Sequence, residues 1–339
     1  MAGEHYVVIG NGPAGNEAAD VLRSGAPDAR VTIVSDEFFP FYYRHRLRDY
    51  IVGGCDEADL VVRTPDHYRE NDVRLRLGQK VTRIDPATET IFLAHMEKIR
   101  YTRLLVCCGG TPRVPEVHYA YRQHLSVMGT LRHARVLRQK MPDLRRVVIC
   151  GGDMISFRVA TTLATVGKEV VFLIDEDAFW PLELTGEVRE EFSRALGRKG
   201  VEVRQEDALT GVDATGHDRY IARTRGGGAI DCDLVGAFFG FVPAIEFLRG
   251  SGLDIERGLL VNERLQTSRQ GVYAAGDCAE IYRPDLRNYW VSIGWPNAQH
   301  LGALAARNML GETVDAGGPA ESVFEVEGIR VNTSWWREF

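Results

Sequence analysis

Long hydrophobic runs are missing from this sequence. No uninterrupted stretch of about 18 apolar residues occurs, so we expect no membrane-spanning helix. A strand-like run begins at Tyr6, so we expect no signal peptide ahead of it. Metal-binding cysteine patterns are also missing. The six cysteines include no CxxC pair and no ligand set typical of zinc or iron–sulfur sites. These absences favour a cytoplasmic protein with reduced thiols and without a bound metal.

Positive charge is in short supply over the whole chain. The formal net charge of -6 at pH 7 argues against nucleic acid or an anionic membrane as a partner. Lysine is nearly absent, since five of the 41 basic residues are Lys and the other 36 are Arg. Local clusters of these Arg residues could still bind an acidic protein. The hydrophobic share of 45% is ordinary for a globular protein, and 339 residues suggest about two domains.

Glycines at a strand-to-helix junction form the first motif. The apolar run Tyr6–Ile9 leads into the pattern Gly10-x-Gly12-x-x-Gly15, and a helix-compatible stretch follows. In this pattern Gly10 allows a tight turn, Gly12 lets the backbone approach a pyrophosphate, and Gly15 lets the helix pack on the strand. The N-terminus of the helix then offers its N–H groups to the phosphates.

A second strand and two acids complete this unit. The apolar run Val31–Val34 follows the helix, and Asp36 and Glu37 come directly after it. An acid in this place binds the ribose hydroxyls of a dinucleotide. The complete strand–helix–strand–acid order therefore predicts a dinucleotide site.

The same pattern begins again near the middle of the chain. The apolar run Val147–Cys150 leads into Gly151 and Gly152, then a helical stretch over 156–166 and the apolar run Val170–Ile174. Two such units predict an α/β fold with two Rossmann-like dinucleotide-binding domains. A basic helix-like stretch containing Arg132, Arg135 and Arg138 lies before the second unit.

Later motifs resemble one family closely. The run Gly271-Val-Tyr-Ala-Ala-Gly276-Asp277, after Gln266-Thr267-Ser268, resembles the pyridine nucleotide–disulfide oxidoreductase superfamily. Phe41-Tyr42-Tyr43-Arg44, with Leu47 and Tyr50 after it, resembles the rubredoxin and ferredoxin reductase branch and the flavin domains of nitrite reductases. The resemblance covers roughly residues 5–312.

This resemblance implies that different segments of the chain bind different cofactors. The first unit would bind FAD, the second would be of the NAD(P)H type, and the chain would then return to the FAD domain. We expect FAD domain segments at 1–114 and 236–312, an NAD(P)H-type domain at 115–235 and a short tail at 313–339. The residues expected to hold FAD are Gly10, Gly12, Pro13, Ala14, Gly15, Asp36, Glu37, Arg44, Val81, Cys108, Gly109, Gly276, Asp277, Asn297 and Ala298.

The second glycine loop departs from the family pattern. Asp153 stands where the family has its second Gly, and Ser156 replaces the third. A carboxylate about 4 Å from a phosphate costs on the order of 4 kcal/mol at an effective dielectric of 20, which approaches a thousandfold loss of affinity. Either this domain has lost ordinary NAD(P)H binding, or Asp153 turns into solvent and NAD(P)H still binds.

A charge exchange is expected beside the flavin. In the ferredoxin reductase branch, a Lys near flavin N5 pairs with a Glu of the second glycine motif. By register, this chain has Asp49 at the Lys position and Arg158 at the Glu position. We predict that Asp49 and Arg158 form an ion pair and are the catalytic residues. A register shift of one residue would instead place Arg48 at the Lys position.

Cysteine and histidine offer little catalytic signal. The Cys-x4-Cys pair of disulfide reductases is absent after the second strand, so that reaction is not expected. Adjacent Cys107 and Cys108 are interpreted as packing residues, and Cys278 has no partner by spacing. His45 is a candidate for proton transfer, with a surface role as the alternative.

The C-terminal end and the function leave alternatives open. Trp335, Trp336 and Phe339 either fold back on their own domain or dock into another subunit. The leading hypothesis is an FAD-containing subunit that passes electrons between flavin and an iron–sulfur or rubredoxin-type protein. A self-contained NAD(P)H-dependent reductase and a structural subunit that keeps FAD for stability are the alternatives.

Overall fold

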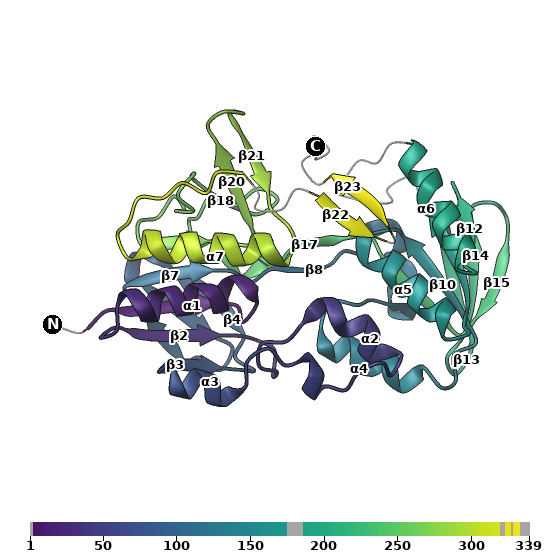
Figure 1. Cartoon of the computed structure of the whole chain (residues 1–339), viewed down its shortest axis with the longest axis horizontal. Helices are drawn as coiled ribbons and strands as arrows, with labels where there is room; N and C mark the ends of the chain where they lie inside the picture. Colours follow the sequence, from purple (N-terminus) through teal and green to yellow (C-terminus); the bar gives the residue numbers. More distant parts are fainter. Residues whose placement is uncertain (1–2, 175–185, 319–322, 327, 333–339) are drawn as a thin grey trace. The chain divides into compact units, whose positions relative to one another are not determined.

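The computed structural model describes residues 3–174, 186–318, 323–326 and 328–332. By contacts the chain divides into two units (Figure 1). Unit 1 contains Met1–Tyr42, Val61–Thr111 and Val242–Glu321, and unit 2 contains Tyr43–Leu60, Pro112–Phe241 and Ser322–Phe339. This division differs from the expected segments mainly at Tyr43–Leu60, which belong to unit 2 although we expected them in the first FAD segment.

A five-stranded parallel sheet is the centre of unit 1. Its strand order is β19-β7-β1-β2-β3, with β1 at the middle. The bounds are β1 His5–Ile9, β2 Arg30–Val34, β3 Val73–Arg76, β7 Arg103–Val106 and β19 Val272–Ala274. Every residue of β1 is buried, as expected for a central parallel strand.

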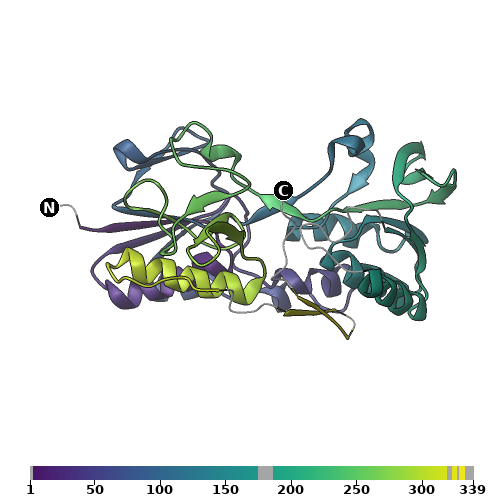
Figure 2. The same cartoon turned by 90° about the horizontal axis from the view of Figure 1, so that it is seen from above.

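Two helices lie side by side on one face of this sheet. They are α1 (Pro13–Gly25) and α7 (Trp295–Met309), and Figures 1 and 2 show their contact from two directions. The helices run parallel, since Ala14 lies against Gly302 in the middle of α7 and Gly25 lies against Leu310 just after its end. Both helices therefore begin at the same edge of the sheet.

Smaller elements complete unit 1. They are α3 (Pro65–Glu70), an antiparallel sheet of β4 (Val81–Asp85), β5 (Thr90–Leu93) and β6 (Lys98–Arg100), and a second small sheet of β18 (Leu259–Val261), β20 (Ala279–Arg283) and β21 (Asn288–Val291). Short 3-10 helices cover Pro86–Thr88 and Glu246–Leu248. Segments β8 (Gly110–Pro112) and β17 (Phe241–Pro243), where the chain passes from one unit to the other, pair as a two-stranded sheet.

Unit 2 repeats the same architecture. Its parallel sheet has the order β12-β11-β10-β16-β9, formed by β9 (Leu125–Ser126), β10 (Arg146–Gly151), β11 (Glu169–Ile174), β12 (Glu202–Gln205) and β16 (Leu234–Phe238). One face contacts an antiparallel sheet of β13 (Leu209–Gly216), β14 (Arg219–Thr224) and β15 (Ala229–Cys232). The other helices and strands are α2 (Leu47–Ile51), α4 (Leu131–Lys140), α5 (Met154–Thr165), α6 (Gly186–Arg198), β22 (Val323–Val326) and β23 (Ile329–Asn332), with 3-10 helices at Arg44–Arg46, Ala58–Leu60 and Glu116–His124.

The two strand-to-helix junctions are equivalent in detail. Gly10 and Gly151 both have positive φ, at 122° and 100°. A Cβ at Gly10 would lie 2.2 Å from the Cys107 carbonyl oxygen, and one at Gly151 would lie 2.1 Å from that of Phe238. Only glycine fits so close to the neighbouring strand. The expected α/β fold with two Rossmann-like domains is confirmed.

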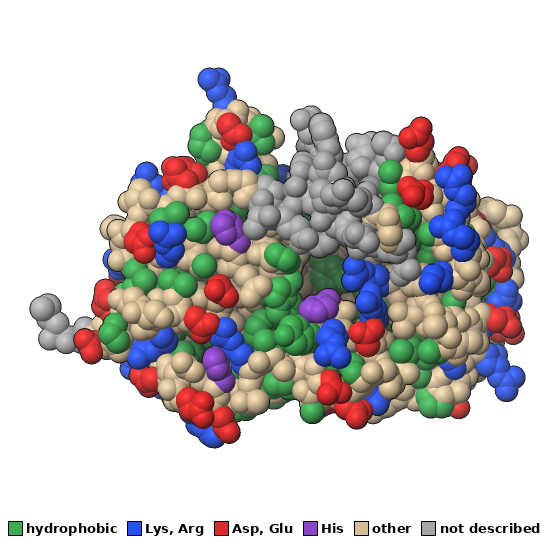
Figure 3. Space-filling model, viewed as in Figure 1, with side chains coloured by type: hydrophobic (Ala, Val, Ile, Leu, Met, Phe, Trp, Pro, Cys, Tyr) green, Lys and Arg blue, Asp and Glu red, His purple; other side chains and the backbone are tan. Residues whose placement is uncertain are grey.

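The surface carries charges of both signs. On the face shown in Figure 3, basic and acidic side chains are intermixed over the described parts of both units. Among the described residues, no helix is long and apolar enough to cross a membrane. The aromatic residues Trp335, Trp336 and Phe339 lie outside the described residues, so their expected packing is not addressed by the fold.

Candidate FAD site and its counterpart in unit 2

The N-terminus of α1 is the centre of the candidate site. Gly12 caps this 13-residue helix, and no side chain accepts a hydrogen bond from its first N–H groups. A Cβ at Gly12 would meet no atom within 4 Å, whereas one at Gly15 would lie 2.1 Å from the Gly10 carbonyl oxygen. Gly12 thus leaves approach space for a phosphate, and Gly15 is required by packing.

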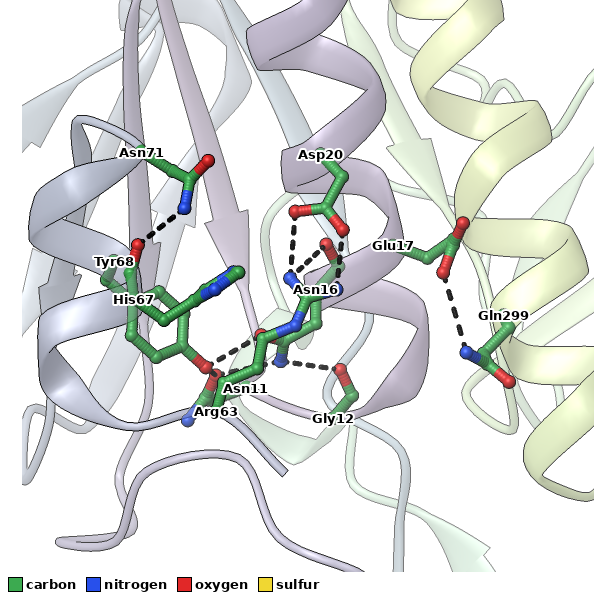
Figure 4. Close-up of polar contacts among 10 residues, drawn as sticks. All are labelled: Asn11, Gly12, Asn16, Glu17, Asp20, Arg63, His67, Tyr68, Asn71 and Gln299. Carbon is green, nitrogen blue, oxygen red and sulfur yellow. Dashed lines mark hydrogen bonds and ion pairs between the residues drawn. The ribbon is translucent and has the colours of Figure 1, made fainter. Parts of the chain in front are cut away.

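A buried amide network holds the glycine loop (Figure 4). The Asn16 side chain is almost completely buried, and its Nδ2 donates to Asn11 Oδ1 at 2.9 Å and to the Gly12 carbonyl at 3.0 Å. The Tyr68 hydroxyl donates to Asn16 Oδ1 at 2.7 Å. Sequence reasoning missed these residues, although a polar side chain on the core side of a helix was an available signal. The network fixes the turn that would face the pyrophosphate.

An ion pair ties α1 to the segment before α3. Arg63 donates to both carboxylate oxygens of Asp20, at 2.8 and 2.5 Å, and to the Asn16 carbonyl at 3.2 Å. Beyond it, the rings of Phe41 and Trp295 stack at 4.9 Å between centroids. These contacts join segments far apart in the sequence, which is why spacing alone did not predict them.

The acids after β2 differ in their surroundings. Asp36 is exposed, whereas Glu37 is partly buried and accepts a hydrogen bond from the Tyr42 hydroxyl at 2.8 Å. A carboxylate held in this way keeps its orientation for ribose hydroxyls. Of the two predicted residues, Glu37 is the better positioned for that contact.

The ends of β7 and β19 contribute the next predicted residues. Gly109 and Gly276 both have positive φ, at 64° and 73°. A Cβ at Gly276 would lie 3.5 Å from Ala14 Cβ and 3.7 Å from Ala298 Cβ, so the chain before Asp277 passes close to both helices. Cys108 lies in the same region and is partly exposed. The carboxyl end of a parallel sheet is where ligands of such folds bind.

The N-terminus of α7 lies at this edge as well. Gly294 caps the helix with a φ of 101° and no side-chain hydrogen bond, and Asn297 donates to the Ile293 carbonyl at 2.8 Å. Two parallel helices thus direct their positive ends to one edge of the sheet. Val81 begins β4 and is buried, and Pro13 starts α1. Within unit 1 these features fit FAD, because they provide phosphate donors, a ribose acceptor and close glycine contacts.

The corresponding helix of unit 2 is closed by its own side chain. Asp153 occupies the place that Gly12 has in α1, and its Oδ1 accepts hydrogen bonds from the N–H groups of Ile155 at 3.0 Å and Ser156 at 2.8 Å. The Ser156 hydroxyl donates to the Asp153 carbonyl at 2.5 Å. The carboxylate therefore takes the N–H groups that a phosphate would use.

Asp153 is buried and does not turn into solvent. Its exposed fraction is 8%. Burial raises the pKa of Asp153 to about 6, although the backbone N–H groups of Ser156, Ile155 and Gly240 act in the opposite direction. The alternative in which Asp153 points into solvent and leaves the loop open is therefore wrong.

The expected ion pair between Asp49 and Arg158 is also wrong. The Asp49 carboxylate pairs with the neighbouring Arg48, at 3.3 Å between Oδ1 and Nε. Arg158 and Asp49 both lie close to His45 in unit 2: burial lowers the pKa of His45, Arg158 lowers it further, and Asp49 acts in the opposite direction. Arg48 is adjacent in sequence and needs no tertiary contact to reach Asp49. The catalytic roles of Asp49 and Arg158 stay predictions.

Arg44 belongs to unit 2. Its Nη1 donates to the Gly129 carbonyl at 2.7 Å, so its expected contact with FAD also stays a prediction.

The basic helix α4 binds an acidic loop of its own unit. Arg135 donates to both carboxylate oxygens of Glu57, at 2.7 and 2.5 Å, and Arg138 donates to the Cys55 carbonyl at 2.8 Å. The Tyr50 hydroxyl also donates to Glu57. An open depression of about 530 Å³ nearby is lined by Tyr50, Glu57, Arg135, Arg138, Gln139 and Pro142. These arginines therefore have internal partners.

Metal chemistry has no visible support in the described ranges. Over residues 3–174, 186–318, 323–326 and 328–332, no group of three or more His, Cys, Asp or Glu side chains could hold an ion. All six cysteines are free thiols.

Comparisons with known proteins agree with this geometry. The chain is 28% identical to putidaredoxin reductase CamA of Pseudomonas putida over 305 residues, which is 88% of this chain and 72% of the relative. It is 29% identical to rhodocoxin reductase of Rhodococcus erythropolis, over 80% of this chain and 64% of the relative. The assimilatory nitrate reductase electron transfer subunit of Bacillus subtilis is 24% identical over 83% of this chain and 36% of its own length.

Solved structures show the same fold. The ferredoxin reductase for the CYP199A2 system of Rhodopseudomonas palustris matches with a TM-score of 0.86 and 26% identity, over 93% of this chain and 78% of that one. The family model described as pyridine nucleotide-disulphide oxidoreductase matches residues 4–300. The chain therefore belongs to the pyridine nucleotide-disulphide oxidoreductase family and is an FAD-dependent oxidoreductase.

Proposed function

We propose that this chain is the FAD-containing subunit of an electron-transfer system and exchanges electrons with an iron–sulfur or rubredoxin-type protein. The observation that carries the proposal is the contrast between two equivalent helix N-termini. Gly12 leaves α1 open to a phosphate, whereas Asp153 closes α5. A chain of this kind keeps its flavin but receives or delivers electrons through a protein partner.

The residues of unit 1 have distinct tasks toward FAD. The N–H groups at the start of α1 would bind the pyrophosphate, and Glu37, oriented by Tyr42, would accept the ribose hydroxyls. Asp277 would accept from the ribityl chain, and the start of α7 would place positive potential near the ring system. FAD supplies the redox chemistry, since it can exchange electrons with one-electron and two-electron partners.

The similar proteins support a protein partner. Putidaredoxin reductase, rhodocoxin reductase and an electron transfer subunit of nitrate reductase are named for redox proteins or for a larger assembly. For this chain we infer that the electron-transfer partner is an iron–sulfur or rubredoxin-type protein. The free state of all six thiols supports the cytoplasm as its compartment.

An NAD(P)H-dependent reductase is the second candidate. A ferredoxin–NAD(+) reductase component of Photorhabdus laumondii is 25% identical over 92% of this chain, which favours this reading. It would require a ligand to displace the buried Asp153 carboxylate from two N–H groups. The first candidate needs no such displacement.

Anaerobic flavin reduction separates the two candidates. We expect NADH and NADPH to leave the flavin of the FAD-loaded protein oxidised, whereas dithionite reduces it. The reduced protein should then transfer electrons to an added [2Fe–2S] ferredoxin or rubredoxin. Rapid bleaching by micromolar NADH would establish the second candidate, and failure of both NADH and protein acceptors would leave neither standing.

A further inference from the structure

Two cysteines far apart in sequence meet at the carboxyl edge of the unit 1 sheet. Strands β7 and β19 are parallel neighbours with Val106 opposite Ala274. Cys108 follows β7 by two residues, and Cys278 follows β19 by four. The Cys278 sulfur lies 3.5 Å from the Val106 carbonyl oxygen, so its side chain turns back toward the end of β7. There the two thiols lie close enough that each shifts the pKa of the other.

The surroundings give the two sulfurs different characters. Cys278 is fully buried, whereas Cys108 is partly exposed. The N–H groups of Cys108 and Gly109 also face the Cys278 sulfur, and together with the Cys108 thiol they lower the pKa of Cys278. The same contact, followed by burial, raises the pKa of Cys108. The pair therefore favours a thiolate at Cys278 and a proton on Cys108.

The other cysteines have different neighbours. Cys107 is also near Cys278, but its sulfur donates to the Gly10 carbonyl at 3.7 Å, on the side of the glycine loop. Cys150 donates to the Gly236 carbonyl at 3.2 Å within unit 2. Cys55 and Cys232 are buried, and both belong to unit 2. Within unit 1 the contact thus singles out one pair.

We propose that Cys108 and Cys278 form a reversible disulfide when the protein meets hydrogen peroxide or another small hydroperoxide. The site differs from the Cys-x4-Cys arrangement, because its members come from two strand ends 170 residues apart. It also differs from the proposed electron-transfer route, since no step requires a nicotinamide or an iron–sulfur protein.

The chemistry balances without any further reactant. The Cys278 thiolate attacks one peroxide oxygen and breaks the O–O bond, and the Cys108 proton converts the leaving hydroxide to water. The Cys108 sulfur then displaces hydroxide from the Cys278 sulfenic acid and forms the S–S bond, and the hydroxide takes up the proton that Cys278 released when it ionised. In sum two thiols lose two electrons and two protons, and one peroxide becomes two waters.

The position of the bond connects it to FAD. Cys108 precedes Gly109 and Cys278 follows Asp277, and both of those residues are predicted FAD contacts. The disulfide would join the two chain segments that hold the cofactor.

Thiol counting on the FAD-loaded full chain tests the proposal. Reduced protein is treated with increasing hydrogen peroxide, denatured, alkylated with N-ethylmaleimide and weighed by mass spectrometry. We expect the six alkylated thiols of the reduced protein to fall to four, and a reductant to restore six. Non-reducing peptide maps should join the peptide of Cys108 to that of Cys278.

Single variants make the assignment specific. Cys278→Ala should keep all five remaining thiols alkylatable, and Cys108→Ala should lose at most one, as the sulfenic acid of Cys278. The control Cys55→Ala should fall from five to three. Cys108→Ser serves in place of either variant that does not bind FAD. A cross-link to Cys107, an unchanged thiol loss in Cys108→Ala, or six intact thiols after oxidation of exposed methionines would each overturn the proposal.

Discussion

Single buried polar side chains control both glycine loops. In unit 1 the Asn16 amide joins Asn11, Gly12 and Tyr68, and in unit 2 the Asp153 carboxylate joins Ile155 and Ser156. Each group is buried, so each hydrogen bond that is lost leaves an unsatisfied polar atom away from water. At the scale of the residue, Asn16 holds the turn before the open end of α1, and Asp153 closes the end of α5.

Asn16→Ala should destabilise unit 1. The substitution removes the acceptor of the Tyr68 hydroxyl at 2.7 Å and a donor to Asn11 Oδ1, and leaves only the longer hydrogen bond from Tyr68 to Asn11, which costs about 1–3 kcal/mol. Urea denaturation measures the change. Asn71→Ala is the matched control, because the exposed Asn71 donates only to the His67 carbonyl, and it should change stability by less than about 0.5 kcal/mol. Equal effects of the two variants would contradict the role of the network.

Asp153 should make stability depend on pH. Its pKa is about 6 in the folded protein against an ordinary value of 3.8, so the folded state holds its proton more tightly. The stability from this group is complete below about pH 4 and is lost as the pH rises to about 6.

Asp153→Asn isolates this effect, because Asn also caps helices well. The variant should exceed the parent in unfolding free energy by roughly 2–3 kcal/mol at pH 7, and the difference should vanish near pH 4. Urea denaturation at several pH values measures it. A constant difference across that range would show that Asp153 does not titrate as described.

At the scale of the element, the starts of α1 and α5 can be exchanged by substitution. The backbone at Gly12 (φ -94°, ψ -170°) nearly equals that at Asp153 (φ -88°, ψ 174°), so an aspartate fits either place. Gly12→Asp should close α1 and lower FAD affinity by up to about a thousandfold through charge repulsion. Flavin content after gel filtration measures the loss, and an unchanged circular dichroism spectrum confirms that the fold survives. Normal flavin content would contradict the proposed phosphate contact.

The reverse change should open α5. Asp153→Gly combined with Ser156→Gly removes the internal cap and the bulk, and NADH affinity should rise roughly ten- to a thousandfold. Isothermal titration of the variant and the parent with NADH provides the measurement. A micromolar dissociation constant already present in the parent would show that the cap is no obstacle.

The repeated elements could be predicted from the sequence, and most long-range pairs could not. Apolar runs and glycine spacing are local, so both strand–helix–strand units and the motif ending at Asp277 were identifiable. Arg63 with Asp20, and Cys108 with Cys278, meet only through the sheet order. The register that paired Asp49 with Arg158 was wrong because the adjacent Arg48 competes for the same carboxylate. The sequence also identified the charge at Asp153. Whether its carboxylate turns inward depended on the N–H groups at the start of α5, to which it binds.

At the scale of the whole molecule, ligands should act on one unit. FAD at a hundred times its dissociation constant adds about 2.7 kcal/mol to the stability of the part that binds it. Hydrogen exchange should therefore slow in β1, β7 and β19 when FAD is added, and NADH should leave β10 and β16 unchanged. The double variant of Asp153 and Ser156 is the control in which NADH protects unit 2. Protection of β10 by NADH in the parent would contradict the proposed function.

The internal cap of α5 also bears on how the protein would respond to the nucleotide pools of the cell. An enzyme with an open nicotinamide loop senses the ratio of reduced to oxidised nicotinamide, and nucleotides such as ADP compete for its pyrophosphate site. In this chain the Asp153 carboxylate already holds that position. Under the proposed function, neither the nicotinamide pool nor free adenine nucleotides would determine the rate of flavin reduction. The supply of electrons would then be governed by the abundance of its protein partner.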